Sequence, residues 1–448
     1  MCFSSFGSLL YSNILRTEEG NGCVPVCVRS VNIVGIVIPS GSVASFDETM
    51  MGSALALASA IVGTTSPNPW VGAILVDSDG EVFEGATEPP PGRHAEIVAL
   101  DALKQAGKSS EGATLYVTLE PCSHYGRTPP CVNSIIDAGI KRVVIAMQDP
   151  DPRVNGSGIK ALEDANVEVE VGILATEVQE LLMPYIKHRV LGMPWVTLKL
   201  AVSADGRIAA PDGSSQWITG EVARRDVHLM RSRSDVIITG AGTVRADDPR
   251  LTVRLGTRVS APLETQEASD MSDMEDVGHT RGITNTGDDT RGAHLPSDSD
   301  SDSDSDSEVI GLHSDDHPEE SKSDDREIHQ PLRIVLGKIP QGARVLPARE
   351  YDGGITDLLR GLAKEGYMSV LVEGGSVVAH EFHNAGMVDR YVLYMAPVLF
   401  GGDDARPMFN GPGVQSMHEL WRGRFVEITP MGDDIKVSIE PKERTWWR

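Results

Sequence analysis

Apolar residues recur every three or four positions after Ser45, a spacing typical of a helix with one buried face. They run from Met51 to Val62. Ser45 and Glu48 stand in the S-x-x-E arrangement of a capping box, in which each side chain bonds the backbone N–H of the other residue. The pattern predicts a helix that begins directly after Ser45, and the two prolines of 65–69 lie beyond its end.

Short apolar runs and helical stretches then alternate as far as residue 171. Predicted strands cover 71–76, 113–119, 142–147 and 167–171, and predicted helices cover 94–106, 131–138 and 157–165. Strands that alternate with helices build βαβ units, in which helices cover the faces of a sheet. This part of the chain is therefore predicted to be an α/β sandwich.

A second series of elements starts with a strand at 195–200, after a segment at 183–189 that we expect to link two domains. A further strand is predicted at 368–372 and a helix at 376–384. Glu373-Gly374-Gly375 stands between them and would let a phosphate approach the helix N-terminus. A Gly-Gly turn is more often only a tight connection, and no G-x-G-x-x-G motif follows the first strand, so the pattern alone assigns no cofactor.

The net charge of −25 is concentrated in one segment. Residues 258–328 hold 21 acidic and 5 basic residues, so 16 of the net negative charges lie there. High charge with almost no aromatic residues cannot support a core, and we predict a disordered acidic insert at 255–330. Its Asp repeats lack the glycine-bearing loop of a calcium-binding EF-hand. The chain has no basic patch, which argues against nucleic-acid binding.

Residues 1–44 are predicted to be a disordered extension. Cys23 and Cys27 are spaced C-x3-C with no histidine nearby, which makes a metal site there improbable. Five cysteines in 448 residues do not form a disulfide framework. No apolar run reaches the roughly 18 residues of a membrane helix, and no secretory signal is recognisable. We therefore expect a cytoplasmic protein.

The stretch from His94 to Cys131 carries the strongest chemical pattern. It contains His94-Ala95-Glu96 and, after Pro121, two cysteines spaced C-x8-C, Cys122 and Cys131. One imidazole and two thiolates leave the fourth tetrahedral position of a zinc ion for water, whose pKa the metal lowers to about 7. Zinc nucleobase deaminases show H-x-E followed by P-C-x-x-C, with the glutamate as proton carrier rather than ligand. This pattern predicts a catalytic zinc site with Glu96 as general acid and base.

Two other interpretations remain open at this point. The zinc could be structural, with His124 as a fourth ligand, in a protein that only binds a partner. Alternatively, the chain could deaminate another base, of the cytidine, deoxycytidylate or tRNA-adenosine type, with an inactive second domain. The long C-x8-C loop and the missing basic surface argue against the second alternative.

The loop from Pro121 to Cys131 resembles the pyrimidine deaminase half of the bifunctional riboflavin-biosynthesis deaminase/reductases. The resemblance extends over 47–254 and 331–445 and includes Ser214-Ser215-Gln216-Trp217 and Ala246-Asp247-Asp248-Pro249. It implies a cytidine-deaminase-like α/β/α sandwich at 45–188. A dihydrofolate-reductase-like domain is implied at 189–445, interrupted by the acidic insert.

The resemblance also implies the site residues of both halves. In the first domain Asn68 would contact the pyrimidine, although a turn residue between two prolines needs no such role. Many relatives carry histidine near Thr87. In the second domain the implied NADPH contacts are Ala201, Trp217, Thr243, Asp247 and Gly375. The implied substrate contacts are Ser215, Arg231, Leu251, Arg254 and Glu373, and the guanidinium groups suit a phosphate. Lys199 and Glu373 are candidates for polarising the sugar.

The resemblance implies two reactions on a small-molecule pyrimidine ribosyl phosphate. The first is zinc-dependent hydrolytic deamination of 2,5-diamino-6-ribosylamino-4(3H)-pyrimidinone 5′-phosphate. The second is NADPH-dependent reduction of the ribosyl group to ribityl. Neither a nucleic acid nor a membrane partner is expected, and relatives assemble, which allows for a homo-oligomer.

Overall fold

The computed structural model describes residues 44–125, 129–254 and 329–444. The predicted extension at 1–44, with Cys23 and Cys27, lies outside the described residues except for Ala44. The acidic insert predicted at 255–330 lies outside them except for its last two positions.

The first domain is built on a five-stranded sheet with the order β2-β1-β3-β4-β5. Its strands are β1 (Gly72–Val76), β2 (Val82–Ala86), β3 (Thr114–Leu119), β4 (Arg142–Met147) and β5 (Glu168–Val171). Its helices are α1 (Phe46–Ala60), α2 (Ala95–Gln105), α3 (Cys131–Asp137), α4 (Ser157–Asp164) and α5 (Ala175–Leu191). Strands β3, β4 and β5 run parallel, whereas β1 is antiparallel to both β2 and β3.

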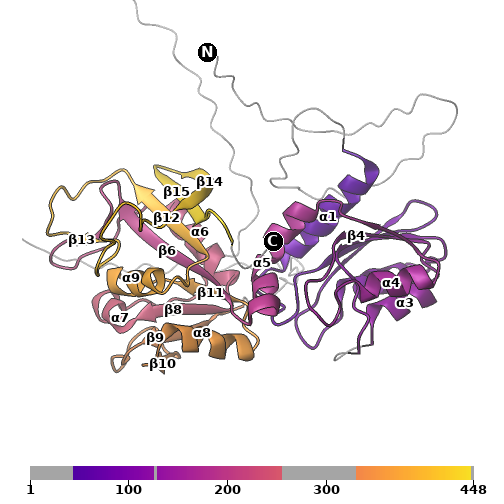
Figure 1. The fold of residues 1–448 in the computed structure, drawn as a ribbon, viewed down its shortest axis with the longest axis horizontal. Helices are drawn as coiled ribbons and strands as arrows, with labels where there is room; N and C mark the ends of the chain where they lie inside the picture. The colour runs from indigo at the N-terminus through magenta and orange to yellow at the C-terminus, as the bar shows by residue number, and fades with distance from the viewer. Residues whose placement is uncertain (1–43, 126–128, 255–328, 445–448) are drawn as a thin grey trace, which may run out of the picture. The chain divides into compact units, whose positions relative to one another are not determined.

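Helices cover both faces of this sheet, which confirms the predicted α/β/α sandwich. Helices α3 and α4 lie together on one side, and α1 and α5 lie on the other (Figure 1). The predicted capping box is present, because Ser45 Oγ accepts the Glu48 backbone N–H and Glu48 accepts the Ser45 N–H. Strands β1, β3 and β4 are buried almost throughout, so they form the centre of the core.

The second domain contains an eight-stranded mixed sheet with the order β10-β9-β8-β11-β6-β12-β15-β14. Its strands are β6 (Trp195–Ser203), β8 (Val236–Gly240), β9 (Leu332–Leu336), β10 (Arg349–Tyr351), β11 (Ser369–Val372), β12 (Arg390–Ala396), β14 (Gly423–Met431) and β15 (Asp434–Pro441). A small separate sheet pairs β7 (Arg207–Ala209) with β13 (Arg406–Pro407). The helices are α6 (Glu221–Ser232), α7 (Ala241–Asp247), α8 (Ile355–Lys364) and α9 (Ser376–Asn384).

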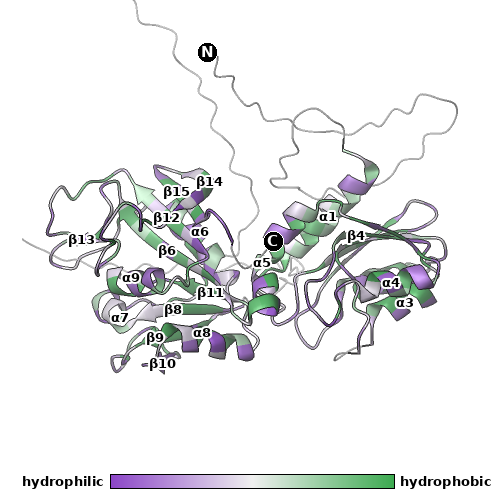
Figure 2. Ribbon diagram, viewed as in Figure 1, coloured by the Kyte–Doolittle hydropathy of each residue, from purple (hydrophilic) through white to green (hydrophobic). Residues whose placement is uncertain are grey.

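The strands at the centre of the large sheet run parallel and are buried on both faces. Strand β11 pairs in parallel with β6 and β8, and β12 extends the parallel set beyond β6. Figure 2 shows β8 in the green of apolar residues, whereas α8 carries both colours. This difference is expected, because a central parallel strand has no solvent face and a covering helix has one.

Helix α5 was not predicted from the sequence. The expected linker at 183–189 is part of this helix, whose Leu182 and Ile186 are fully buried in the core of the first domain. Near its end, Lys187 forms a buried ion pair with Asp389 at 2.5 Å. Helix α5 continues past residues 188 and 189, between which the sequence predicts the domain boundary. The position of that boundary stays a prediction.

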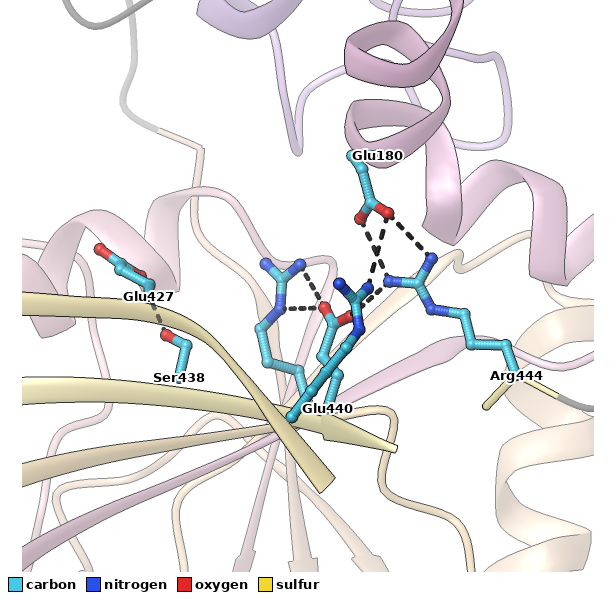
Figure 3. A network of polar contacts seen from close by, with 7 residues as sticks. Glu180, Glu427, Ser438, Glu440 and Arg444 are labelled. Atoms are coloured by element: carbon cyan, nitrogen blue, oxygen red, sulfur yellow. Dashed lines mark hydrogen bonds and ion pairs between the residues drawn. The ribbon is translucent and has the colours of Figure 1, made fainter. Parts of the chain in front are cut away.

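A cluster of charged residues ties the end of the described chain to α5. Glu440 has a fully buried side chain and accepts hydrogen bonds from Arg390, Arg424 and Arg444. Arg444 also donates to both carboxylate oxygens of Glu180 on α5, at 3.1 Å each (Figure 3). Three guanidinium groups thus compensate the buried charge of Glu440, which would be costly if it were unpaired.

Candidate active sites in the two domains

Three potential metal ligands meet in the first domain. His94, Cys122 and Cys131 bring one nitrogen and two sulfur atoms within 4.8 Å of one another. His94 Nδ1 lies 3.6 Å from Cys122 Sγ and 3.3 Å from Cys131 Sγ. Tetrahedral zinc with bonds of about 2.0–2.3 Å separates its ligands by about 3.5–3.8 Å. The donor set and the spacing therefore fit a zinc ion.

Local structure places each ligand at the end of an element. His94 is the N-cap of α2, with the extended backbone angles φ −75° and ψ 157°. Cys131 is the first residue of α3, and Cys122 follows the end of β3. The Cys131 backbone N–H donates to Cys122 Sγ at 3.3 Å. The helix predicted at 131–138 is confirmed, and Pro130 is its N-cap.

The two thiols have different proton affinities. The Cys131 side chain donates a hydrogen bond to Cys122, and with His94 it lowers the pKa of Cys122 to about 4. The same contact, together with burial, raises the pKa of Cys131. Cys122 is therefore held as a thiolate, the form of cysteine that binds metal.

Glu96 lies beside these ligands in a cavity of about 300 Å³. Its side chain is buried, and burial, followed by the charge of Cys122, raises its pKa. A carboxyl group with a raised pKa can take up and release a proton near neutral pH. His94 and Glu96 share the cavity because they stand at the entry of α2, where the helix has not completed its first turn.

Asn68 and Thr87 also line this cavity. Two hydrogen bonds hold the turn that carries Asn68. The Asn68 N–H donates to the Thr65 carbonyl at 2.8 Å, and the Thr65 hydroxyl donates to the Asn68 carbonyl at 2.9 Å. His124 lines the cavity too, and its Nδ1 is buried without a hydrogen-bond partner among the described residues. It is not part of the group of metal-ligating atoms found in this part of the chain.

Glu120 supports the site, and the sequence analysis did not find it. Its buried carboxylate accepts four backbone N–H groups, from Asp149 at 3.1 Å, Gly156 at 2.9 Å, Gly158 at 2.8 Å and Ile159 at 3.2 Å. These bonds fix the start of α4 against the segment that leads to Cys122. The acidic residue directly before Pro121-Cys122 was the available signal, and its partners are distant in sequence.

All predicted residues of the second site line one cavity of about 1500 Å³. They are Ala201, Ser215, Trp217, Arg231, Thr243, Asp247, Leu251, Arg254, Glu373 and Gly375, and Lys199 lies with them. The structure therefore brings together residues from both sides of the acidic insert.

Two helix N-termini open into this second cavity. Gly240 is the N-cap of α7 and Gly375 is the N-cap of α9, and the Gly375 N–H donates to Thr243 Oγ1 at 3.0 Å. A Cβ atom on Gly240 would lie 2.7 Å from Val378 Cγ2, so the close packing requires glycine there. Free N–H groups at helix N-termini attract phosphate groups. The Gly374-Gly375 turn is therefore more than a tight connection, because it shapes the cavity wall.

Arg231 and Glu373 form a bidentate ion pair at 2.6 and 2.9 Å. Burial alone would raise the pKa of Glu373, but the charge and hydrogen bonds of Arg231, together with the charges of Lys199 and His228, outweigh it and hold the pKa below its usual value. Arg231 also donates to the Thr252 carbonyl at 3.3 Å. Burial lowers the pKa of Lys199, whose ammonium lies 5.7 Å from the ring centre of Tyr394. Arg231 is thus engaged with protein groups, whereas the sequence suggested only a phosphate partner.

His228 is a further cavity residue that the sequence analysis missed. Its Nδ1 accepts the backbone N–H of Arg254 at 3.2 Å, and its Nε2 lies 3.5 Å from Arg254 Nη2. Leu251 has the left-handed angle φ 51° and is buried, a conformation that costs energy for a residue with a side chain. Such strain is retained where surrounding contacts impose it, as they do in this wall of the cavity.

Comparison with known families matches both halves of the chain. The family described as the cytidine and deoxycytidylate deaminase zinc-binding region matches residues 44–147. The RibD C-terminal domain family matches residues 194–283 and 313–437. The fold and the two sites define a two-domain enzyme, with a zinc-dependent deaminase domain followed by a reductase domain.

Relatives match nearly the whole chain. The riboflavin biosynthesis protein RibD of Bacillus amyloliquefaciens is 37% identical over 89% of this chain and 97% of its own length. RibD of Escherichia coli K12 is 36% identical over 88% and 99%. The Acinetobacter baumannii RibD structure superposes with a TM-score of 0.68 at 31% identity, over 89% of this chain and 99% of that one. The chain belongs to the RibD family of bifunctional deaminase/reductases of riboflavin biosynthesis.

Membership of this family confirms the predicted deaminase and reductase activities. It also decides against a deaminase with an inactive second domain and against a purely structural zinc module. No helix in the described ranges is long and apolar enough to cross a membrane.

Proposed function

We propose that the first domain removes an amino group of 2,5-diamino-6-ribosylamino-4(3H)-pyrimidinone 5′-phosphate by hydrolysis of its C–N bond. His94, Cys122 and Cys131 would hold a zinc ion, which would supply an activated water at neutral pH. The Glu96 carboxylate takes a proton from the water and returns it to the departing amine, so that ammonia leaves and a carbonyl replaces the C–N bond. Asn68 orients the pyrimidine.

The second domain then reduces the ribosyl group of the deaminated product to ribityl, with NADPH as the cofactor. Bound NADPH would supply hydride to C1′ of the sugar, and a proton would go to the ring oxygen, which becomes a hydroxyl when its bond to C1′ breaks. Ala201, Trp217, Thr243, Asp247 and Gly375 would hold the nicotinamide nucleotide, and the two helix N-termini in the cavity would favour its phosphates. Ser215, Arg231, Leu251, Arg254 and Glu373 contact the substrate.

The same assignment gives Lys199 the role of polarising the sugar. Burial lowers its pKa below that of an exposed lysine, so it gives up a proton more readily. A relative from Thermotoga maritima, 28% identical with a TM-score of 0.66 over 88% of this chain and 98% of that one, carries both reaction names in its title. It is described as a diaminohydroxyphosphoribosylaminopyrimidine deaminase and 5-amino-6-(5-phosphoribosylamino)uracil reductase, which supports the proposed substrates.

The observation that carries this proposal is the cluster of His94, Cys122 and Cys131, of which His94 and Cys122 line one cavity with the buried Glu96. A paired assay on the purified zinc-loaded protein tests it. Ammonia release and NADPH oxidation are followed in one sample with the diaminopyrimidinone ribosyl phosphate. We expect both signals, with NADPH oxidation lagging behind ammonia.

Ammonia release without NADPH oxidation would contradict the assignment of the second cavity. Oxidation that precedes ammonia would contradict the order of the two steps. The cytoplasmic location and a homo-oligomeric assembly stay predictions.

A further inference from the structure

The deaminase cavity contains two arginines that the metal chemistry does not use. Arg153 and Arg189 line the same cavity as His94 and Glu96. Arg153 lies in the loop before α4 and Arg189 lies near the end of α5. They are the only lysine or arginine residues among the described residues that line it.

Asp151 holds both guanidinium groups. Arg153 forms a bidentate ion pair with it, with Nε at 2.9 and 3.1 Å from the two carboxylate oxygens. Arg189 Nε lies 3.6 Å from the same carboxylate. The Asp151 side chain is only 5% exposed, and Arg153 lowers its pKa to about 2. Asp151 therefore stays charged and keeps the two cations close together.

Arg189 is fixed on two further sides. Its Nη2 donates to the Pro67 carbonyl at 3.0 Å, directly before Asn68. Its guanidinium lies 5.0 Å from the ring centre of Tyr185, whose hydroxyl donates to Asp149. The cation is thus attached to the turn that carries the proposed pyrimidine contact.

Both guanidinium groups keep donors that no described residue uses. A guanidinium offers five N–H donors in a planar fork. No hydrogen bond of Arg153 Nη1 or Arg189 Nη1 to a described residue is found. Arg153 has a side chain that is 61% exposed, and Arg189 one that is 22% exposed. One arginine thus faces the mouth of the cavity and the other lies deeper.

We propose that Arg153 and Arg189 recognise the 5′-phosphate of the deaminase substrate. This inference rests on the proposed function, in which the substrate is a pyrimidine ribosyl phosphate. A phosphate monoester accepts charge-assisted hydrogen bonds from guanidinium forks, and the unused N–H donors of the two arginines suit its oxygens. Asp151 is a positioning residue, because it neutralises one of the two cations and orients both before the substrate arrives.

The test compares two substrates, the pyrimidine ribosyl phosphate and the same riboside without its phosphate. Ammonia release by the zinc-loaded protein gives kcat/KM for each. We expect the unaltered protein to prefer the phosphate form. In Arg153→Gln, kcat/KM for the phosphate form should fall about tenfold or more, mainly through KM. The value for the riboside should stay unchanged. Arg189→Gln should shift the ratio in the same direction.

Lys160→Gln is the matched control. Lys160 is a 71% exposed cation on α4, paired with Asp164, and it does not line the cavity. Its substitution should leave both values unchanged. Zinc content and the melting temperature are measured for every variant, because Arg189 also holds the Pro67 turn. If Arg189→Gln loses zinc or folds poorly, the exposed Arg153 decides the question.

An unchanged ratio of the two kcat/KM values in Arg153→Gln would overturn the inference. An equal fall for both substrates would also overturn it, because it would indicate a structural role only. An unaltered protein that treats phosphate and riboside alike would contradict phosphate recognition altogether. Absence of ammonia release from either substrate in the unaltered protein would instead refute the proposed function.

Discussion

The two active sites are assembled in different ways. The deaminase site takes its three metal ligands from one short stretch, His94 to Cys131, and each ligand stands at the end of a helix or strand. The reductase site gathers its residues from β6 to the start of α9, on both sides of the acidic insert. A local motif defines the first site, whereas only the folded sheet brings the second together.

Because of this difference, residue type alone indicates a residue's role in the deaminase site but not in the reductase site. A histidine and two cysteines at metal-ligand spacing have few other uses, so their chemistry can be inferred from residue type. An arginine has many uses, and Arg231 shows this, since Glu373 and Thr252 occupy its guanidinium. Roles in the reductase site therefore depend on partners that only the structure identifies.

Cys131→Ser should produce the largest separation between the two sites. A serine hydroxyl is a poor zinc ligand, so zinc content and ammonia release should be lost almost completely. NADPH oxidation with the deaminated pyrimidine ribosyl phosphate should continue, because the second cavity has no part in the metal site. Metal analysis and the two assays measure this. Loss of both activities in folded protein would show that the sites are coupled.

Glu373→Gln should affect only the reductase. It leaves the buried Arg231 without its counter-charge, which costs about 3 kcal/mol of stability. We expect NADPH oxidation to fall about 100-fold or more while ammonia release persists. The control is Glu221→Gln, which removes an exposed partner of Arg225 on α6 and should change neither property. Equal effects of the two substitutions would contradict the role of the buried pair.

Glu120→Gln should weaken the deaminase site indirectly. An amide has one acceptor oxygen and cannot satisfy the four backbone N–H groups that the carboxylate accepts. We expect a loss of about 2–3 kcal/mol in unfolding free energy, with weaker zinc retention. Denaturant unfolding and zinc competition with a chelator measure both quantities. The control is the exposed Glu163 on α4, the helix whose first N–H groups Glu120 accepts. Glu163→Gln should change neither quantity.

Ser45→Ala should have the smallest effect. It removes the side-chain acceptor at the N-terminus of α1, which contributes about 1 kcal/mol. Ser45→Asp should restore most of it, because aspartate is an equally good N-cap. Amide hydrogen exchange in α1 reports the change, and both enzyme activities should stay as they are. Equal protection in Ser45→Ala would contradict the contribution of the cap.

Much of the fold could be predicted because its patterns are local. The capping box at Ser45, the strands from β3 to β5 and helix α9 at 376–384 all agree with the sequence analysis. Helix α5 could not be recognised, because it contains Pro184 and its polar residues find partners in the second domain. The segment 183–189 was therefore predicted to be a linker where tertiary contacts support a helix.

The supporting residues of the sites were the hardest to predict. Glu120 and His228 act through backbone N–H groups far along the chain, and Asp151 acts through two arginines. Glu120 stands directly before Pro121-Cys122, whereas nothing in the sequence neighbourhood of Asp151 and His228 distinguishes them from surface residues. The zinc ligands could be predicted from the sequence because their residue types and spacing are typical of a zinc site.

The measurement that tests the central claim most directly is the paired assay on Glu96→Gln. This variant keeps the metal ligands and the cavity but removes the proton carrier. We predict normal zinc content, ammonia release reduced about 10²- to 10⁴-fold, and unchanged NADPH oxidation with the deaminated substrate. Ammonia release at the unaltered rate would contradict the account of the deaminase site.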